Sequence, residues 1–329
     1  MFAEYTNLIK FAVFHSGADR AQKGKGMVLI MESGATKTDC CLLDAGGEER
    51  CRFRLTGMNM AANDAAAVPR AMRDAVSLVS EAGFSASDDV SELFFYGAGI
   101  TDVLPAGTDA VREAFPSASC HFHSDLLAAA RGLCGQARGI VAILGTGSNS
   151  CLYDGERIVK NIRPGGYVLG DEGSAASLGR MFLSDYIKEL LPDEVSDDFR
   201  SEYGLDYNAV VNLVYKSPHP AADVAAFAPY VMKWRDEPYL HEMICRNFRN
   251  FIERSLLRYE VPQAESAAGP APAYPEVSVT GSFGCACRDI LEGLASGYGL
   301  RFVRFMPAPM DGLLLYHRKN IGRKPLPGN

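Results

Sequence analysis

The sequence predicts an α/β protein with two domains, each built on a mixed β-sheet that carries helices on its faces. The first observation is the order of segments from residue 27 onward, where three strands are followed by alternating helices and strands. The second is a strand–turn–strand unit with a small polar turn, which begins at Met27 and again at Gly139. The third is size, because 329 residues, 47% of them hydrophobic, suffice for roughly two domains with cores of their own.

Composition excludes several classes of protein. The formal net charge of -7 argues against a nucleic-acid binder, because phosphate backbones require a basic face, although a nucleotide ligand needs only a local pocket. The longest apolar runs fall far short of a membrane span. The 9 cysteines are scattered and partly lie inside apolar runs, which suits reduced thiols packed as small hydrophobic residues in the cytosol. We therefore expect a cytoplasmic protein that binds neither nucleic acid nor a membrane.

The first 26 residues lack the features of a secretory signal. The apolar patch between Asn7 and His15 is short and contains a lysine, and the chain starts without a basic side chain. We interpret residues 1–26 as a flexible extension, with Met27 as a candidate translation start.

The stretch 27–44 opens the first domain and is typical of a β-hairpin, with two apolar runs around a turn that contains hydroxyls, one glycine and Lys37. Beyond it the chain alternates between strand and helix patterns, and Asn63 or Asp64 caps the first helix. We expect strands at 48–55, 91–96 and 118–123, and helices at 65–82, 108–114 and 126–133.

A second strand–turn–strand unit resembles the first in order and in turn chemistry. An apolar strand at 139–144, a small polar turn at 145–150 and an answering strand at 151–154 lead into a third strand. Two such hairpins facing each other can grip the two sides of a polyphosphate. Later we expect helices at 175–191, 207–215, 221–232, 239–259, 288–297 and 309–316, and a strand at 300–305.

The turn of the first hairpin leaves two interpretations open. Its backbone N–H groups can cradle phosphate oxygens, and the carboxylate of Glu32 beside them can hold a hydrated Mg²⁺. A hairpin of serine, glycine and threonine that binds no ligand explains the same residues equally well.

Three motifs occur in an order that points to a known family: the turn at 34–38, the second turn at 145–149, and a run at 165–174 in which Gly-Asp-Glu-Gly-Ser follows a double glycine. With them, the chain from Met27 to about Tyr316 resembles the N-acetylglucosamine kinase and BadF/BadG/BcrA/BcrD ATPase family, and no P-loop run is present. The resemblance implies duplicated ribonuclease H-like domains, as in actin-like ATPases, at 27–137 and 138–329. It also implies a nucleotide cleft between them and a C-terminal helix that can pack back on the first domain.

The resemblance further implies a role for each site residue. The two turns would hold the ATP phosphates, and the Gly-Ser turn of the later segment would hold the adenosine. The acceptor hydroxyl needs a base, which the resemblance places at Asp125, while Glu32 would hold Mg²⁺ through water. The expected phosphate-binding residues are Gly34, Thr36, Lys37, Thr38, Gly145, Thr146 and Gly147; the adenosine-binding residues are Gly281 and Ser282; and the substrate-binding residues are Asn59, Asn149, Asp171 and Glu172.

Several of these carboxylates also have a structural interpretation. Ser124 and Asp125 are favoured helix caps, which explains both residues without catalysis, although such kinases place their base just before the hinge into the second half. Asp171 and Glu172 precede a helix, where carboxylates are ordinary. The glycines on both sides of this pair instead suit the close approach of a hydroxyl-rich ligand.

Two departures from the family bear on activity. Glu32 stands where the family usually has aspartate, and its extra methylene group can displace a water-mediated metal contact. Phe283 follows the adenosine segment where smaller residues are common.

We expect an ATP- and Mg²⁺-dependent kinase that phosphorylates a hydroxyl of an amino sugar, with N-acetylglucosamine as the leading candidate. An ATPase that activates a partner enzyme and a sugar sensor weakened by Glu32 remain as alternatives, and a homodimer is left open.

Overall fold

The computed structural model describes residues 12–14, 26–34, 37–58, 60, 66–101, 104–260 and 275–321. The chain divides into two compact units, Met1–Gly135 together with Pro309–Asn329, and Gln136–Ala308. Each unit has a sheet and a hydrophobic core of its own. None of the described helices is long and apolar enough to cross a lipid bilayer.

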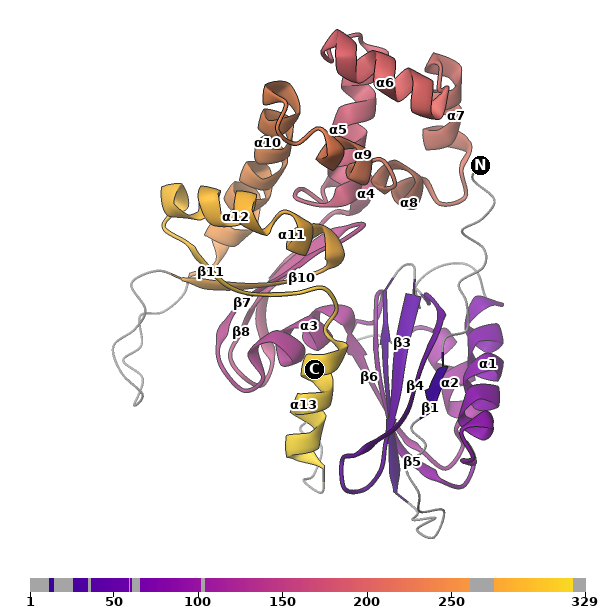
Figure 1. Cartoon of the computed structure of the whole chain (residues 1–329). Coiled ribbons are helices and arrows are strands. Elements are labelled where there is room, and N and C mark those ends of the chain that lie inside the picture. Colours follow the sequence, from indigo (N-terminus) through magenta and orange to yellow (C-terminus); the bar gives the residue numbers. More distant parts are fainter. Residues whose placement is uncertain are drawn as a thin grey trace. The chain divides into compact units, whose positions relative to one another are not determined.

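The first unit is built on a six-stranded mixed sheet with the order β1-β4-β3-β2-β5-β6 (Figure 1). The strands β2, β3 and β4 form an antiparallel meander, and β5 and β6 continue the sheet in parallel from β2. A short strand that the sequence did not reveal, β1, pairs antiparallel with β4. The bounds are β1 (Ala12–Phe14), β2 (Met27–Ser33), β3 (Lys37–Leu43), β4 (Glu49–Thr56), β5 (Val90–Gly97) and β6 (Ser119–Ser124).

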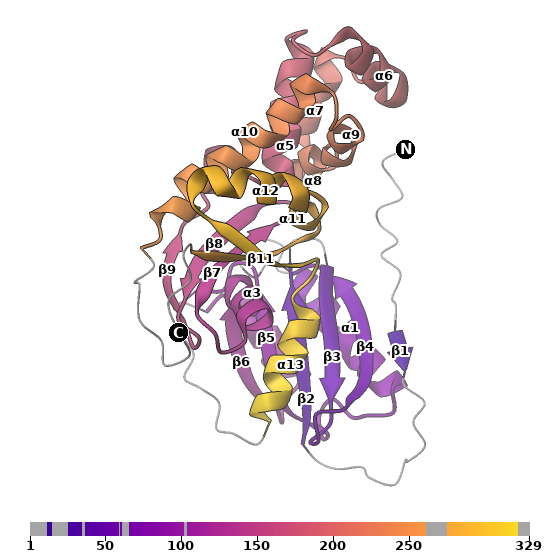
Figure 2. The ribbon, with the colours of Figure 1, turned by 60° about the vertical axis from the view of Figure 1, so that its left-hand side comes forward.

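Strand alternation sends the apolar residues of β2 to both faces of this sheet. Leu29 and Met31 join a core under α1 (Ala67–Glu81) and α2 (Gly107–Ala114). Val28 and Ile30 belong instead to a cluster that contains residues of α3 and α13. These two helices, α3 (Asp125–Cys134) and α13 (Met310–Asn320), lie side by side in Figures 1 and 2. The C-terminal helix therefore belongs to the first unit.

The second unit contains a five-stranded sheet with the order β11-β10-β7-β8-β9. The strands β7, β8 and β9 form an antiparallel meander, and β10 pairs in parallel with β7. Apart from β1, the two sheets have the same order and the same directions, which confirms the predicted duplicated α/β fold. The bounds are β7 (Gly139–Leu144), β8 (Ser148–Tyr153), β9 (Ile158–Ile162), β10 (Glu276–Thr280) and β11 (Arg301–Met306).

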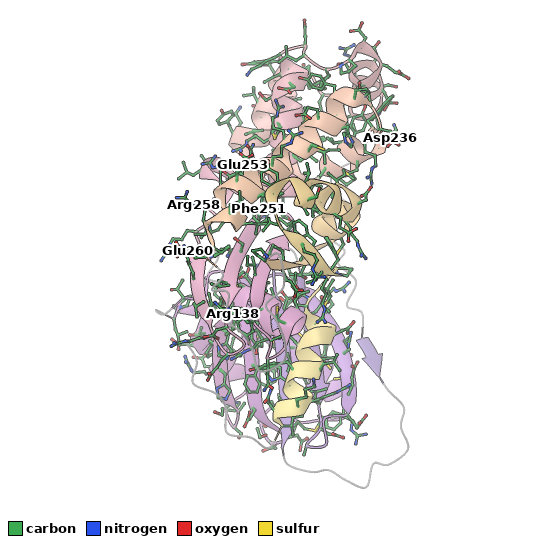
Figure 3. The ribbon with its side chains drawn as sticks, turned by 90° about the vertical axis from the view of Figure 1, so that its left-hand side faces the viewer. Arg138, Asp236, Phe251, Glu253, Arg258 and Glu260 are labelled. Atoms are coloured by element: carbon green, nitrogen blue, oxygen red, sulfur yellow. The ribbon has the colours of Figure 1, made fainter. Side chains whose placement is uncertain are left out.

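Helices inserted between β9 and β10 bury one face of the second sheet. Their core includes a cluster of aromatic rings with Phe182, Phe199 and Tyr230 at its centre, and Phe251 of α10, labelled in Figure 3, is buried in the same core. The helices of the unit are α4 (Gly166–Leu169), α5 (Ala175–Ile187), α6 (Asp193–Tyr203), α7 (Tyr207–Lys216), α8 (Pro220–Ala225), α9 (Ala228–Lys233), α10 (Pro238–Arg254), α11 (Ser282–Ala286) and α12 (Arg288–Ala295), with 3₁₀ turns at Leu256–Arg258 and Ser296–Tyr298.

Besides β1, the structure contains other elements that differ from those predicted. The single helix expected at 221–232 is two helices, because α8 ends before Phe227 and Pro229 lies in the first turn of α9. The helix α6 was not predicted, although Pro192 followed by Asp193 and Glu194 is typical of a helix start. The predicted caps at 63–64 lie outside the described residues.

Candidate functional site

A backbone hydrogen bond closes the turn of the first hairpin, and the hydroxyl groups of the residues on either side anchor it. The N–H of Gly34 donates to the carbonyl of Lys37 at 3.0 Å. Behind the turn, the hydroxyl oxygens of Ser33 and Thr38 lie 2.7 Å apart, and Ser33 also bonds to both backbone groups of Met58. Thr38 donates to the carbonyl of Thr56 at 3.0 Å. The buried Thr38 hydroxyl is thus engaged in holding the hairpin.

Charged side chains gather at the base of this hairpin. Glu32, the residue before the last in β2, pairs directly with Asp39 on β3, and both side chains are buried. Asp39 accepts hydrogen bonds from Lys37 at 2.8 Å and from Arg54 at 2.7 Å. Burial alone would raise the pKa of Asp39, but these two cations outweigh it and hold that pKa below its usual value. The ammonium group of Lys37 is therefore committed to Asp39 in this structure.

Glu32 is the carboxylate with the more strongly altered acidity. Burial raises the pKa of Glu32 to about 7, and the negative charges of Asp39 and Asp125 raise it while Lys37 lowers it. The charge of Asp125 thus acts on Glu32 within the first unit, and the base role expected for Asp125 stays a prediction. The negative charge of Glu32 is poorly balanced by the protein itself, as is typical of a carboxylate that binds a cation.

Asp125 lies at the start of α3, directly after β6. Ser124 is the helix cap, since its hydroxyl accepts from the N–H of Leu127 at 3.2 Å. Asp125 accepts from the N–H of Leu126 at 2.8 Å, which orients the carboxyl group. Burial raises its pKa, and the backbone hydrogen bonds oppose that rise. The cap is supplied by Ser124, so capping alone does not account for the half-buried aspartate beside it.

The turn of the second hairpin is closed in the same manner but is joined to a helix. The N–H of Gly145 donates to the carbonyl of Gly147 at 3.0 Å. The carbonyls of Gly145 and Thr146 accept from the first N–H groups of α5, those of Ala175 and Ala176, at 2.9 and 3.0 Å. The start of α5 is thereby fixed against the turn, with Ser174 as its cap.

Asp171 lies against this turn. Its backbone is in the left-handed region with φ of 54°, and a Cβ on Gly147 would lie 2.8 Å from Asp171 Oδ2. Burial raises the pKa of Asp171 to about 6, and the charge of Glu172 raises it, while the N–H groups of Ser148 and Gly166 and the charge of Arg180 lower it. Only glycine at 147 leaves room for this carboxylate, which explains that residue of the turn.

Glu172 points elsewhere. Its carboxylate pairs with Arg254 of α10 at 2.7 Å and lines a cavity between α5 and α10. The sequence suggested that Asp171 and Glu172 act together on one ligand. The structure instead gives them different neighbours, because the left-handed backbone at Asp171 turns the chain between them.

The predicted adenosine segment adjoins the second turn within the same unit. Gly281 has φ of 114°, and a Cβ there would lie 2.2 Å from the carbonyl oxygen of Leu144 and 3.1 Å from the N–H nitrogen of Gly145. Ser282 then begins α11. The preceding residue, Thr280, has a buried hydroxyl without a hydrogen-bond partner among the described residues. Turn and adenosine segment therefore form one surface.

The remaining predicted residues are less informative. The side-chain oxygen of Asn149 accepts from its neighbour Ser150 at 2.9 Å and from Asn161 at 2.8 Å, which ties it to the edge of the sheet. Thr36 and Asn59 lie outside the described residues. Sequence reasoning missed Asp39 and Arg54, although the antiparallel register that places Asp39 opposite Glu32 could have indicated the former.

The carboxylate of Glu32 fits a Mg²⁺ site that water and the phosphate oxygens of a nucleotide complete. Within the described ranges, no group of three or more His, Cys, Asp or Glu side chains is placed to hold a metal ion by itself. Mg²⁺ does not require such a group, because it commonly binds through one carboxylate, water and the phosphate oxygens of a nucleotide. Glu32, buried at the base of the first hairpin, suits that arrangement. The nine cysteines are all free thiols.

Comparison with known proteins agrees with this picture. The model of the BadF/BadG/BcrA/BcrD ATPase family matches residues 31–237. The structure of a putative N-acetylglucosamine kinase from Porphyromonas gingivalis is similar at 35% identity and a TM-score of 0.78, covering 89% of this chain and 99% of that chain. A putative N-acetylglucosamine kinase from Chromobacterium violaceum shares the fold at 19% identity and a TM-score of 0.66, over 88% and 98% of the two chains. No curated protein matches the chain. Since the family model spans more than half of its length, the chain belongs to the BadF/BadG/BcrA/BcrD ATPase family.

Proposed function

We propose that the protein is an ATP-dependent kinase that phosphorylates a hydroxyl of an amino sugar, with N-acetylglucosamine as its substrate. The similarity at 35% identity to a structure described as a putative N-acetylglucosamine kinase supports the substrate class. The observation that carries the proposal is the half-buried aspartate at the start of α3, whose charge acts on Glu32 of the first hairpin.

In this proposal Asp125 is the general base. Its carboxylate accepts the proton of the sugar hydroxyl while the hydroxyl oxygen attacks the γ-phosphorus, and the bond from that phosphorus to the bridging oxygen breaks as ADP leaves. The raised pKa makes the carboxylate a stronger base, and the hydrogen bond from Leu126 holds it in one orientation.

The other residues position the reactants. The turns at 34–38 and 145–147 hold the phosphates, Gly281 and Ser282 hold the adenosine, and Asp171 receives a sugar hydroxyl. Bound Mg²⁺ would offset charge on the phosphate oxygens, with Glu32 holding it through water. Exclusion of water around the sugar would limit idle hydrolysis of ATP.

One observation favours a second candidate, a sugar- or nucleotide-binding sensor with weakened catalysis. Burial raises the pKa of Glu32 to about 7, so without a cation about half of these carboxyl groups are protonated at neutral pH. A partly neutral metal ligand lowers catalysis but leaves binding of the sugar intact. In a sensor, Glu32→Asp would restore turnover, whereas in a kinase it would change turnover little.

A coupled ADP-release assay over a panel of hexoses tests the proposal. We expect ADP release with N-acetylglucosamine well above release with glucose, mannose or no sugar, and incorporation of phosphate into the sugar. Equal ADP release with and without every sugar would contradict a kinase and favour the ATPase that activates a partner protein.

A further inference from the structure

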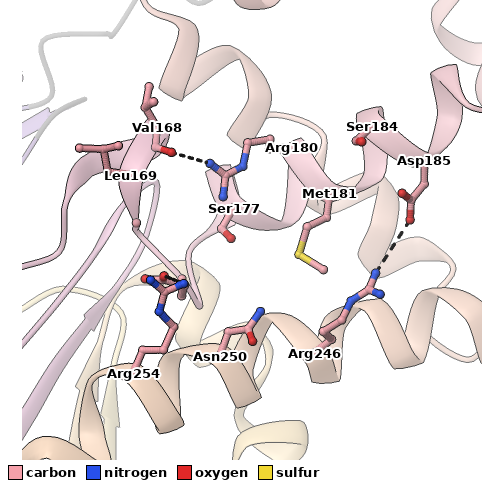
Figure 4. Close-up of a pocket in the computed structure, with 12 residues that line it drawn as sticks. Val168, Leu169, Ser177, Arg180, Met181, Ser184, Asp185, Arg246, Asn250 and Arg254 are labelled. Carbon is pink, nitrogen blue, oxygen red and sulfur yellow. Dashed lines mark hydrogen bonds and ion pairs between the residues drawn. The ribbon is translucent and has the colours of Figure 1, made fainter.

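The second unit contains a polar cavity beside the segment 168–172. It has a volume of about 530 Å³ and lies between α5 and α10, closed at one end by the segment from α4 to Glu172 (Figure 4). Among the proposed kinase residues only Glu172 lines it. A cavity of this size accommodates a small metabolite.

Three arginines line this cavity from two directions. Arg246 and Arg254 project from α10, with Asn250 between them on the same face of the helix, and Arg180 projects from α5. The carboxylates among the lining residues are Glu172 and Asp185, so the lining carries a net positive charge. A small anion is therefore favoured over a neutral or cationic ligand.

Two of these guanidinium groups keep donors available. Arg180 uses one nitrogen, Nη1, for the carbonyls of Tyr167 and Val168 at 2.7 and 3.2 Å, and within the described ranges no carboxylate pairs with it. Arg246 lies 3.9 Å from Asp185, beyond hydrogen-bond distance, and Asp185 accepts instead from the hydroxyl of Tyr239 at 3.0 Å. A guanidinium group offers five N–H donors in a fork that matches phosphate oxygens.

The cavity also provides neutral hydrogen-bonding groups and a connection to the proposed kinase site. Ser177 on its wall is buried, and Asn250 faces it across the cavity in Figure 4. Such groups suit the hydroxyls of an organic phosphate. Arg180 holds the backbone of α4 and its charge acts on Asp171, so a ligand at Arg180 is adjacent to the loop that carries Asp171.

We propose that this cavity binds a small phosphate-bearing metabolite, with its phosphate group meeting the available donors of Arg180 or Arg246. A phosphate group presents three terminal oxygens and up to two negative charges, so it suits guanidinium donors better than a carboxylate group does. The proposal is independent of the kinase reaction, because it depends only on the lining of the cavity.

Titration calorimetry of inorganic phosphate into the full chain, at constant ionic strength with chloride as the blank, tests this site. Arg246→Gln removes a charge-assisted contact and is expected to weaken phosphate binding about tenfold. Arg249→Gln is the matched control, since Arg249 lies on the same helix but pairs with Glu242 at 2.7 Å and does not line the cavity. Arg246→Lys, which keeps the charge and loses the fork, is expected to fall between the two.

N-acetylglucosamine 6-phosphate distinguishes the sources of the phosphate group. Tighter binding than inorganic phosphate, lost in Arg246→Gln, identifies an organic phosphate as the occupant; equal affinity identifies free phosphate. Phosphate that does not bind the wild-type chain, or that binds wild type, Arg246→Gln and Arg249→Gln with equal affinity, would overturn the proposal, provided that the unfolding midpoints of the three proteins in chloride agree.

Discussion

The two hairpins share one backbone plan and differ in what stabilises it. In the first, the turn is anchored by buried hydroxyls, and the charges of Glu32, Lys37 and Asp39 gather at its base. In the second, the turn carbonyls cap α5, and the packing of Asp171 and Leu144 leaves no space beside two glycines. Substitutions of Gly147 in the second turn and of Gly281 beside it should therefore disturb structure, whereas those of charged residues in the first hairpin should mainly change charge.

Gly281→Ala is expected to have the largest effect on stability. The new Cβ would lie 2.2 Å from the carbonyl oxygen of Leu144, at a φ of 114° that L-residues rarely adopt. The combined clash and strain should cost about 3 kcal/mol or more in the free energy of unfolding. Gly204→Ala, at φ of 62° with nothing within 4 Å, is the control and should cost about 1 kcal/mol. Urea unfolding measures both; equal losses would show that the contact with Leu144 is unimportant.

Gly147→Ala sharpens the comparison between the hairpins. Its Cβ would lie 2.8 Å from Asp171 Oδ2, so the carboxylate must move, at a cost of about 1–3 kcal/mol. Gly145→Ala in the same turn has nothing within 4 Å, and Gly34→Ala in the first turn meets only the carbonyl of Lys37 at 3.9 Å. These two variants should each lose less than about 1 kcal/mol in chemical denaturation. Three similar losses would show that the contact with Asp171 does not set Gly147 apart.

Glu32→Gln tests the charges of the first hairpin through the pH dependence of stability. A carboxyl whose pKa is raised to about 7 on folding binds its proton more tightly in the folded protein, so wild type loses stability as pH rises from about 4.5 to about 7. Glutamine does not ionise. The variant should therefore gain on the order of 2 kcal/mol relative to wild type near pH 8, and the gain should vanish below about pH 4. Thermal unfolding in the presence of a metal chelator is the measurement; a difference independent of pH would contradict the assignment.

Lys37→Gln should have the smallest effect on stability. The pair between Lys37 and Asp39 is partly exposed on the lysine side, so its loss should cost less than about 1 kcal/mol. If the turn binds ATP as proposed, the same variant should weaken ATP binding by about tenfold, with less dependence on salt than in wild type. Unchanged affinity would indicate that Lys37 serves the hairpin alone.

The sequence predicted what depends on local pattern. Apolar runs on both sides of a polar turn identified both hairpins, and the duplicated fold was implied by the family resemblance that their turns support. Only part of the site could be predicted from the sequence. The different directions of Asp171 and Glu172 depend on one left-handed residue. The burial that raises the pKa of Glu32 depends on strands and helices distant in sequence. The sequence did not indicate the arginines of the cavity, because Arg180 lies on α5 and Arg246 and Arg254 lie on α10, and these helices are distant in sequence.

The base role of Asp125 is the central claim, and Asp125→Asn tests it most directly. Asparagine keeps the size of the side chain but cannot accept the proton, so kcat for N-acetylglucosamine phosphorylation should fall by about 1,000-fold while the Kd for ATP stays within about twofold of wild type. Asp109→Asn is the control, because Asp109 also lies in the first turn of a helix, on α2, where it forms an exposed ion pair with Arg112. Wild-type kcat in Asp125→Asn, measured by ADP release at saturating sugar, would contradict the account.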